Sequence, residues 1–134
     1  WSPAARDACR RLTSRGVPVL NQCVLLAGIN DEAAVLEELF RTLVANRVKP
    51  HYLFHVDPVR GVRHFATGIE AGLAILRHFR ANLSSLAVPT FAIDLPEGGG
   101  KVALQPDYRD GVNRYRDIRD RKSILYLERL QSEQ

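Results

Sequence analysis

The order of apolar and polar positions along the chain predicts helices and strands in alternation. Apolar positions at helical spacing predict a first helix from about Pro3 to Arg15, with Ser2 as its N-cap. Nearly continuous apolar runs, each followed by a turn signal, predict strands that are buried on both faces. We expect these strands at 17–26, 51–56 and 88–93.

Two further helices are expected between these strands. The first has apolar residues at helical spacing after a cap at Asn30 or Asp31. The second opens with Thr67 and Glu70, which have the spacing of a capping box. The resulting order of elements, helix and strand in turn, is typical of parallel α/β units with right-handed crossovers.

Three parallel strands are too few to close a barrel, so the domain is either small and open or part of a (β/α) barrel cut from its partner strands. We favour the second option and assign residues 1–105 to the C-terminal portion of the barrel and 106–134 to a partly irregular C-terminal extension. A short extra strand is expected near 123–127. A chain of 134 residues that starts at Trp1 without Met suggests a fragment of a longer protein.

Composition narrows the class of protein. Apolar residues make up 46% of the chain, yet no apolar run approaches the roughly 20 residues of a membrane span, and no signal peptide is visible. Cys9 and Cys23 belong to no CxxC pair, so we expect reduced thiols and no metal site built from this chain alone. These features predict a cytoplasmic protein.

The net charge of +4 is modest, and basic and acidic residues alternate in the C-terminal extension. Such mixed signs are typical of a solvated surface with ion pairs and not of a nucleic-acid stripe, so no nucleic acid and no membrane is expected as a partner. The residues concerned are Arg109, Arg114, Arg116, Arg119, Arg121 and Lys122, with Asp107, Asp110, Asp117 and Asp120.

Two aspartates follow neighbouring strands of the predicted sheet. Ligands of parallel sheets lie at the carboxyl ends of the strands, where Asp57 and Asp94 should converge. A pair of carboxylates can bind an ammonium group or a metal, or share a proton. Alternatively, each aspartate caps the turn that follows its strand.

The run from Glu97 through Gly98, Gly99 and Gly100 to Lys101 is unusual. Glycines let the backbone approach a ligand and offer N–H groups to an anion, although the pattern is not a Walker A loop. A lysine beside such a loop could form a Schiff base; alternatively, the run is a flexible surface turn. His51, His55, His64 and His78 have no ligand spacing, and we read His78 as helix surface and His55 and His64 as polar packing residues that flank the site.

Five runs of sequence resemble the lysine 2,3-aminomutase family, over about residues 1–108 without a large gap. The spacing from Asp57 to Asp94 to Lys101 is the specific part of this resemblance. The matching runs are 16–26, 28–31, 47–57, 64–65 and 89–101.

The resemblance implies a radical S-adenosylmethionine enzyme with a [4Fe-4S] cluster and pyridoxal phosphate, which moves the α-amino group of L-lysine to the β-carbon. By the same resemblance, Lys101 holds pyridoxal phosphate beside Gly98, Gly99 and Gly100, and Gln22 lies near S-adenosylmethionine. The resemblance also implies that Asp57 and Asp94 bind the side-chain ammonium of the substrate, since relatives acting on glutamate lack this pair.

The chain departs from the family pattern in three ways. The cluster motif CxxxCxxC is absent, so its ligands are expected outside this chain and the chain alone should not catalyse. Glu97 stands where the family usually has glycine. No cysteine follows Cys23, and Glu32 replaces one ligand of a zinc site found in some relatives, which leaves zinc and the homo-oligomeric state open. Two alternatives stay open: a relative that supplies (R)-β-lysine to elongation factor P, and a small α/β binding module with a basic tail.

Overall fold

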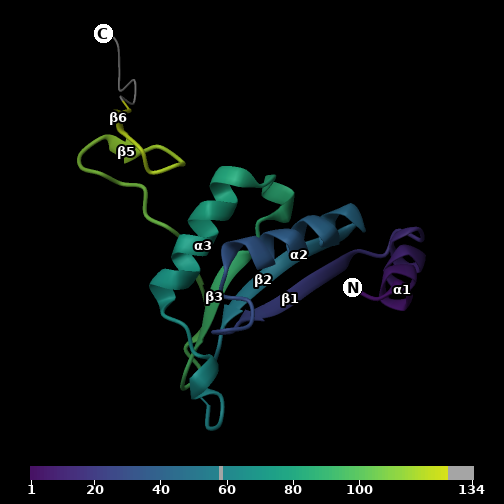
Figure 1. The fold of residues 1–134 in the computed structure, drawn as a ribbon. Helices are drawn as coiled ribbons and strands as arrows, with labels where there is room; N and C mark the ends of the chain where they lie inside the picture. The colour runs from purple at the N-terminus through teal and green to yellow at the C-terminus, as the bar shows by residue number, and fades with distance from the viewer. Residues whose placement is uncertain (58, 127–134) are drawn as a thin grey trace.

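The computed structural model describes residues 1–57 and 59–126, and it shows an α/β fold with a mixed sheet (Figure 1). The α-helices are α1 (Pro3–Thr13), α2 (Ala33–Ala45) and α3 (Ile69–Asn82), with short 3-10 turns η1 (Arg63–Phe65) and η2 (Ser85–Ala87). The strands are β1 (Val19–Leu25), β2 (Val48–His55), β3 (Thr90–Leu95), β4 (Gly100–Leu104), β5 (Arg114–Arg116) and β6 (Ser123–Leu125).

The main sheet has the order β1-β2-β3-β4. The first three strands are parallel, as predicted, and each is reached from the last through a helix. The expectation of purely parallel units is wrong for β4, which is antiparallel to β3. The reason is the length of the connection: Pro96 to Gly99 are enough for a hairpin, whereas a parallel crossover needs a dozen or more residues. Closure into a barrel is not seen in this sheet of the described residues.

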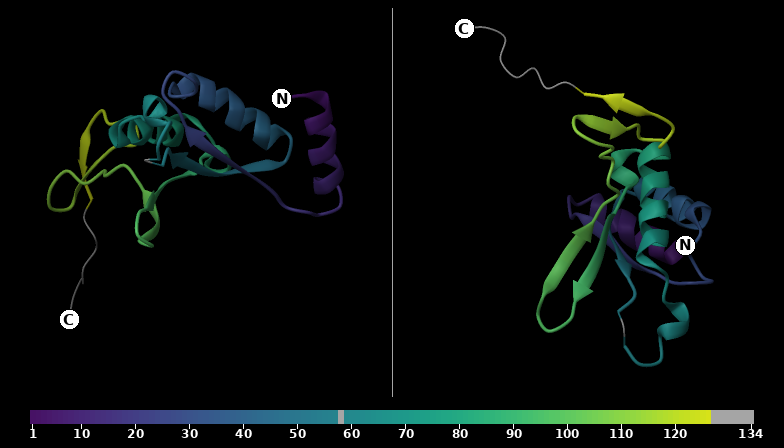
Figure 2. Two further views of the ribbon diagram at one scale, coloured as in Figure 1. Left: turned by 90° about the horizontal axis from the view of Figure 1, so that it is seen from below. Right: turned by 90° about the vertical axis from the view of Figure 1, so that its left-hand side faces the viewer.

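Helices α2 and α3 lie side by side on one face of the sheet (Figures 1 and 2). The core forms between them and this face, because the apolar stripes of both helices meet the inward residues of the strands. Its fully buried side chains include Leu36, Phe40, Leu76 and Phe79 from the helices and Leu25, Leu53 and Phe91 from the strands. No α-helix of the described residues covers the opposite face of the sheet (Figure 2).

The caps of the helices only partly follow the predictions. Ser2 caps α1 as expected, since its hydroxyl accepts a hydrogen bond from the backbone N–H of Ala5 at 3.2 Å. The prediction that Asn30 or Asp31 caps α2 is wrong, because both side chains close the preceding turn and the N-cap residue is Glu32. 

The prediction that Thr67 and Glu70 form a capping box is wrong as well. Gly68 is the N-cap of α3, and no side chain makes a cap hydrogen bond there. The buried hydroxyl of Thr67 has no hydrogen-bond partner among the described residues.

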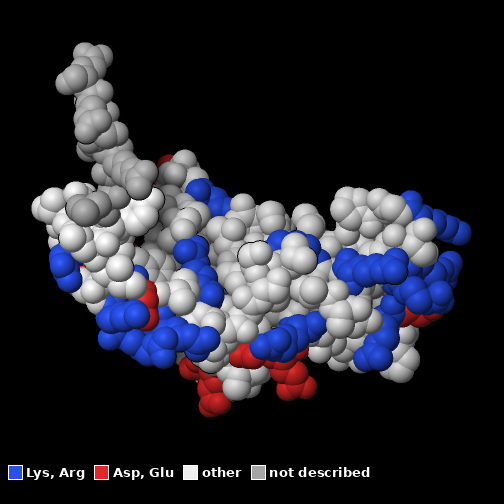
Figure 3. Space-filling model, turned by 90° about the horizontal axis from the view of Figure 1, so that it is seen from above, with Lys and Arg blue, Asp and Glu red and all other residues white. Residues whose placement is uncertain are grey.

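Helix α1 and strands β5 and β6 lie outside the main sheet. Helix α1 has no buried residue and stands beside one end of β1 (Figure 1). The predicted strand near 123–127 is found as β6, which pairs with β5 in a separate two-stranded sheet, and residue 127 lies outside the described part. In Figure 3, basic side chains gather at the end that carries α1. Among the described residues, the helices are all too short or too polar to cross a membrane.

Candidate functional site

Three of the predicted site residues lie on the uncovered face of the sheet. Residues directly opposite each other on paired strands point to the same face, and faces alternate along each strand. Gln22 is the partner of Tyr52, and Asp94 is the partner of Lys101. The core residues Leu53 and Phe91 are partners on the other face. Gln22, Asp94 and Lys101 therefore share the face opposite the helices.

Lys101 lies in β4 and not in a loop, contrary to the expectation of a lysine emerging from a glycine-rich turn. Its ammonium reaches across the sheet and lies 4.8 Å from the centre of the Tyr52 ring and 4.4 Å from that of Phe54. The two rings are stacked on each other with centroids 5.1 Å apart. A cation over an aromatic face is attracted by the electron-rich ring. The hairpin and these two rings thus fix where the amine lies.

The sequence does not identify Tyr52 and Phe54 as residues of the site. Aromatic residues in an apolar strand are usually core residues. Their two-residue spacing is the available signal, because it places both on one face, and the register then shows that this face is the uncovered one.

Asp57 and Asp94 line one hollow of about 310 Å³ at the carboxyl ends of β2 and β3. Asp57 is exposed two residues after β2, and Asp94 is exposed near the end of β3. Most of the wall is apolar, with side chains from the loop after β2 and the start of α3, such as Val59, Val62 and Ile69. The two aspartates therefore line the same hollow, as the sequence predicts.

The turn between β3 and β4 needs its glycines for backbone geometry. Glu97 and Gly98, its two central residues, have φ of 57° and 79°, and Gly100 has φ of 80°. The Gly99 N–H donates to the Pro96 carbonyl at 3.1 Å. An added Cβ at Gly99 would lie 2.7 Å from the Leu95 Cβ, whereas at Gly98 and Gly100 it would meet open space. Glu97 therefore occupies a left-handed position that favours glycine.

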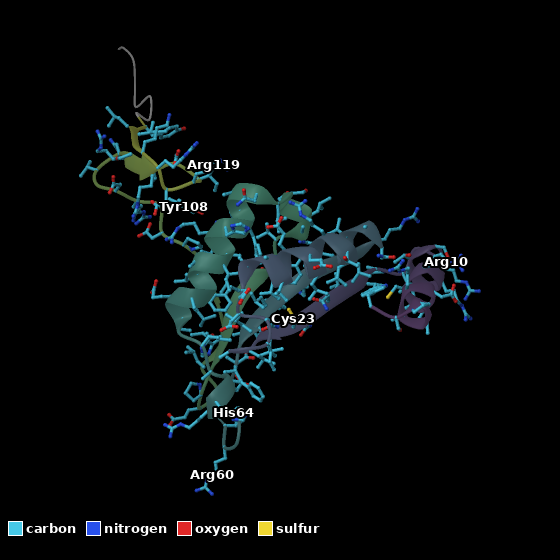
Figure 4. The ribbon with its side chains drawn as sticks, in the orientation of Figure 1. Arg10, Cys23, Arg60, His64, Tyr108 and Arg119 are labelled. Atoms are coloured by element: carbon cyan, nitrogen blue, oxygen red, sulfur yellow. The ribbon has the colours of Figure 1, made fainter. Side chains whose placement is uncertain are left out.

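Among the histidines, His55 and His78 make hydrogen-bond contacts between elements, and His78 lies on the surface of its helix as predicted. His55 lines the hollow, but its Nε2 lies 2.8 Å from the Thr67 carbonyl, which ties β2 to the loop before α3. His64 lies on that loop, with Arg60 nearer its tip (Figure 4). His78 is on the surface of α3, where its Nε2 lies 2.8 Å from a carboxylate oxygen of Glu37.

Neither cysteine points to metal chemistry. Cys23 is half-buried in β1 (Figure 4), and burial raises the pKa of its thiol to about 11, which keeps it protonated and unreactive. Within residues 1–57 and 59–126, no three side chains of His, Cys, Asp or Glu gather as a metal site would require.

The uncovered face therefore combines an exposed primary amine, on Lys101, with the carboxylate of Asp94, which lines the same hollow as Asp57. The amine can attack an aldehyde, and the carboxylates can bind a cation. Among the described residues, no ion pair within 4.0 Å joins Lys101 to Asp94 or to Asp57. Asp94 and Lys101 are direct partners in the sheet, yet their charged groups form no ion pair.

Comparisons with known proteins identify the family of the chain. Residues 76–115 match the family model described as lysine-2,3-aminomutase. The chain is 47% identical over 102 residues to L-lysine 2,3-aminomutase of Bacillus subtilis, which covers 76% of this chain and 22% of the relative. It is 44% identical over 107 residues to L-lysine 2,3-aminomutase of Fusobacterium nucleatum, covering 80% of this chain and 25% of the relative.

The match is not confined to proteins named for lysine. Glutamate 2,3-aminomutase of Clostridioides difficile is 42% identical over 104 residues, covering 78% of this chain and 25% of the relative. The chain thus spans about a quarter of the length of the relatives it matches, and it matches their C-terminal part. The resemblance seen in the sequence is confirmed: the chain belongs to the lysine 2,3-aminomutase family.

Proposed function

We propose that this chain is the C-terminal part of a radical S-adenosylmethionine aminomutase that converts L-lysine to β-lysine. In this proposal Lys101 carries pyridoxal phosphate, and Asp57 and Asp94 bind the side-chain ammonium of the substrate. The observation that carries it is the shared position of Lys101 and Asp94 on the uncovered face, next to the hollow that Asp57 also lines.

The residues present fit pyridoxal phosphate. Lys101 is exposed on a face that no α-helix of the described part covers, so an aldehyde can reach its amine. The adjoining turn leaves open space at Gly98 and Gly100 for a phosphate group. When bound, the group would supply an aldehyde that holds an amino group and spreads unpaired electron density over its ring. The chain's own part is to anchor and orient it.

Substrate selection rests on the two carboxylates. Overall identity does not separate lysine from glutamate, since the two L-lysine 2,3-aminomutases named above are 44% and 47% identical to this chain and the glutamate 2,3-aminomutase is 42% identical. A pair of carboxylates at one hollow favours a cation at the far end of the substrate and repels the carboxylate of glutamate. We therefore favour L-lysine as the substrate.

The remaining cofactors are placed outside or beside this chain. Gln22 lies on the same face as Lys101, and we propose that it adjoins S-adenosylmethionine. The ligands of the [4Fe-4S] cluster would come from another part of the protein, because this chain has only Cys9 and Cys23. The proposal places the protein in the cytoplasm. It includes no nucleic-acid partner, and the ion pairs of Arg116 with Asp120 and of Arg121 with Asp117 offset part of the charge of the extension.

The test is to trap the cofactor on its lysine. The full-length protein is incubated with pyridoxal phosphate, reduced with borohydride and mapped by mass spectrometry. We expect the label on Lys101 and its loss in Lys101→Arg, which keeps the charge. The chain's other lysines are internal references: Lys122 is exposed, and the ammonium of Lys49 donates to the carbonyls of Leu86 and Val88. Labelling of Lys122 in preference to Lys101 would contradict the proposal.

A further inference from the structure

Lys101 is held by two aromatic rings instead of by a carboxylate. The Cα partner of Lys101 is Asp94, which lies on the same face and is the nearest acidic residue across the hairpin. Yet the ammonium is turned toward β2, 4.4 Å from the centre of the Phe54 ring and 4.8 Å from that of Tyr52. Both rings are half-buried and stacked on each other, so packing restrains the orientation of each ring.

This arrangement leaves the carboxylate of Asp94 open to another cation. Asp94 is exposed and has no ion pair within 4.0 Å among the described residues. A lysine that paired with Asp94 would compete with a substrate ammonium for the same oxygen atoms. A lysine over aromatic rings does not compete, because the rings attract its charge without using any hydrogen-bond acceptor.

We propose that Tyr52 and Phe54 form a resting place for the ammonium of Lys101 after an incoming amine has displaced it from its aldehyde partner. This inference rests on the proposed function of Lys101. Tyr52 and Phe54 are positioning residues that act on the cofactor through Lys101. The rings stabilise the released, charged form of the lysine, and they thereby favour transfer of the bound group to the incoming amine.

The exchange balances in atoms and charge. The carbon–nitrogen double bond to the protonated Nζ of Lys101 is broken, and an equivalent bond forms to the nitrogen of the incoming ammonium. Two protons that leave the incoming ammonium end on Nζ, which departs as an ammonium group. No oxidant, reductant or net proton is required. The charged product of this step on the protein is the species that the rings attract.

The experiment measures how bound pyridoxal phosphate is divided between Lys101 and a simple amine. The full-length protein is equilibrated with pyridoxal phosphate and methylamine, reduced with borohydride and analysed by mass spectrometry for label on Lys101 and on methylamine. Methylamine is used because it needs no contact with the aspartate pair. Replacing both rings, Tyr52→Leu with Phe54→Leu, should shift the ratio toward Lys101 by about two- to fivefold.

Two sets of variants keep the result interpretable. Tyr52→Phe and Phe54→Tyr retain a ring at each position and should leave the ratio unchanged. Replacing Phe54 by trifluorophenylalanine keeps the size of the side chain but weakens its attraction for a cation, so it should shift the ratio in the same direction as the leucines even if the double variant does not fold.

The outcomes separate this inference from the proposed function. If the unaltered protein carries no label on Lys101 when methylamine is left out, the proposed function itself fails. If Lys101 is labelled but the ratio is unchanged in the fluorinated and leucine variants, or moves toward methylamine, the resting place is overturned while the role of Lys101 stands.

Discussion

At the scale of single residues, Glu97 is the position where sequence and backbone conflict. Its φ of 57° lies in the left-handed region, which costs an L-residue other than glycine roughly 1 kcal/mol. The residues beside it in the turn are Gly98 and Pro96, and the turn is closed by a hydrogen bond between the Gly99 N–H and the Pro96 carbonyl. The conflict concerns backbone conformation and predicts an effect on stability.

We predict that Glu97→Gly stabilises the protein. The expected gain in the free energy of unfolding is about 0.5–1 kcal/mol, because relief of the left-handed strain exceeds the added flexibility of the unfolded chain. Urea unfolding measures it. Glu97→Ala is the control, since alanine keeps the strain and should give no gain. An equal gain from alanine would show that the carboxylate, and not the backbone, is responsible.

The candidate site was predictable from the sequence only where chemistry marks a residue. Asp57, Asp94 and Lys101 stand out because charged residues follow apolar runs at turn signals. The position of Lys101 in a strand was not predictable, because the same glycines suit a ligand-binding loop and a tight hairpin. Tyr52 and Phe54 were missed because a strand pattern does not say which face the rest of the chain leaves uncovered.

At the scale of elements, α3 lies close to β3 because Gly72 has no side chain. An added Cβ at Gly72 would overlap the ring of Phe91, which is fully buried. We predict that Gly72→Ala lowers the free energy of unfolding by about 1–3 kcal/mol, although alanine favours a helix by about 1 kcal/mol over glycine. Thermal or urea unfolding measures this loss.

A double-mutant cycle tests the cause. In a Phe91→Leu background the ring is absent, so Gly72→Ala should cost less than in the unaltered protein. Equal costs in the two backgrounds would mean that the loss does not arise from the contact with Phe91.

Helices α2 and α3 are also joined by an ionic cluster on their outer surface. Glu37 accepts a hydrogen bond from Arg41 Nε at 2.9 Å, and its other carboxylate oxygen lies 2.8 Å from Nε2 of His78. Asn82 extends the cluster, with its side-chain nitrogen 3.3 Å from the other ring nitrogen of His78. The hydrogen bond with His78, followed by that with Arg41, lowers the pKa of Glu37 from its ordinary 4.5.

This lowered pKa predicts a loss of stability in acid. A carboxyl group whose pKa is lower in the folded state stabilises the protein above its unfolded pKa, and this contribution disappears as the pH falls through the folded pKa. Urea midpoints measured from about pH 6 down to about pH 3 should therefore fall more steeply in the unaltered protein than in Glu37→Gln.

Glu38→Gln is the matched control for this prediction. Glu38 is the next residue of α2 and makes no ion pair among the described residues. Its removal should leave the pH dependence close to that of the unaltered protein. Parallel curves for Glu37→Gln and the unaltered protein would contradict the prediction.

At the scale of the whole molecule, the alternation of helices and strands was predictable, and the mixed sheet was not. Helical spacing in 33–45 and 69–82 and apolar runs in the first three strands follow from local sequence. The direction of β4 depends on whether the residues after β3 form a hairpin or a crossover, which is decided by chain length and turn geometry. Its pairing with β3 places Lys101 opposite Asp94.

The uncovered face of the sheet is expected to promote self-association of the chain. Leu20 and Val24 of β1 are 53% and 38% exposed, and Val24 is the partner of Phe54 on this face. Exposed apolar side chains on an uncovered sheet face promote association in water. The 134-residue chain on its own should therefore self-associate as its concentration rises. Leu20→Ser with Val24→Ser should reduce this association, as measured by sedimentation velocity.

Val35→Ser is the control, since Val35 is 46% exposed on α2, away from this face, and its loss should leave association unchanged. Equal effects of the two changes would show that total surface hydrophobicity, and not the open face of the sheet, drives the association.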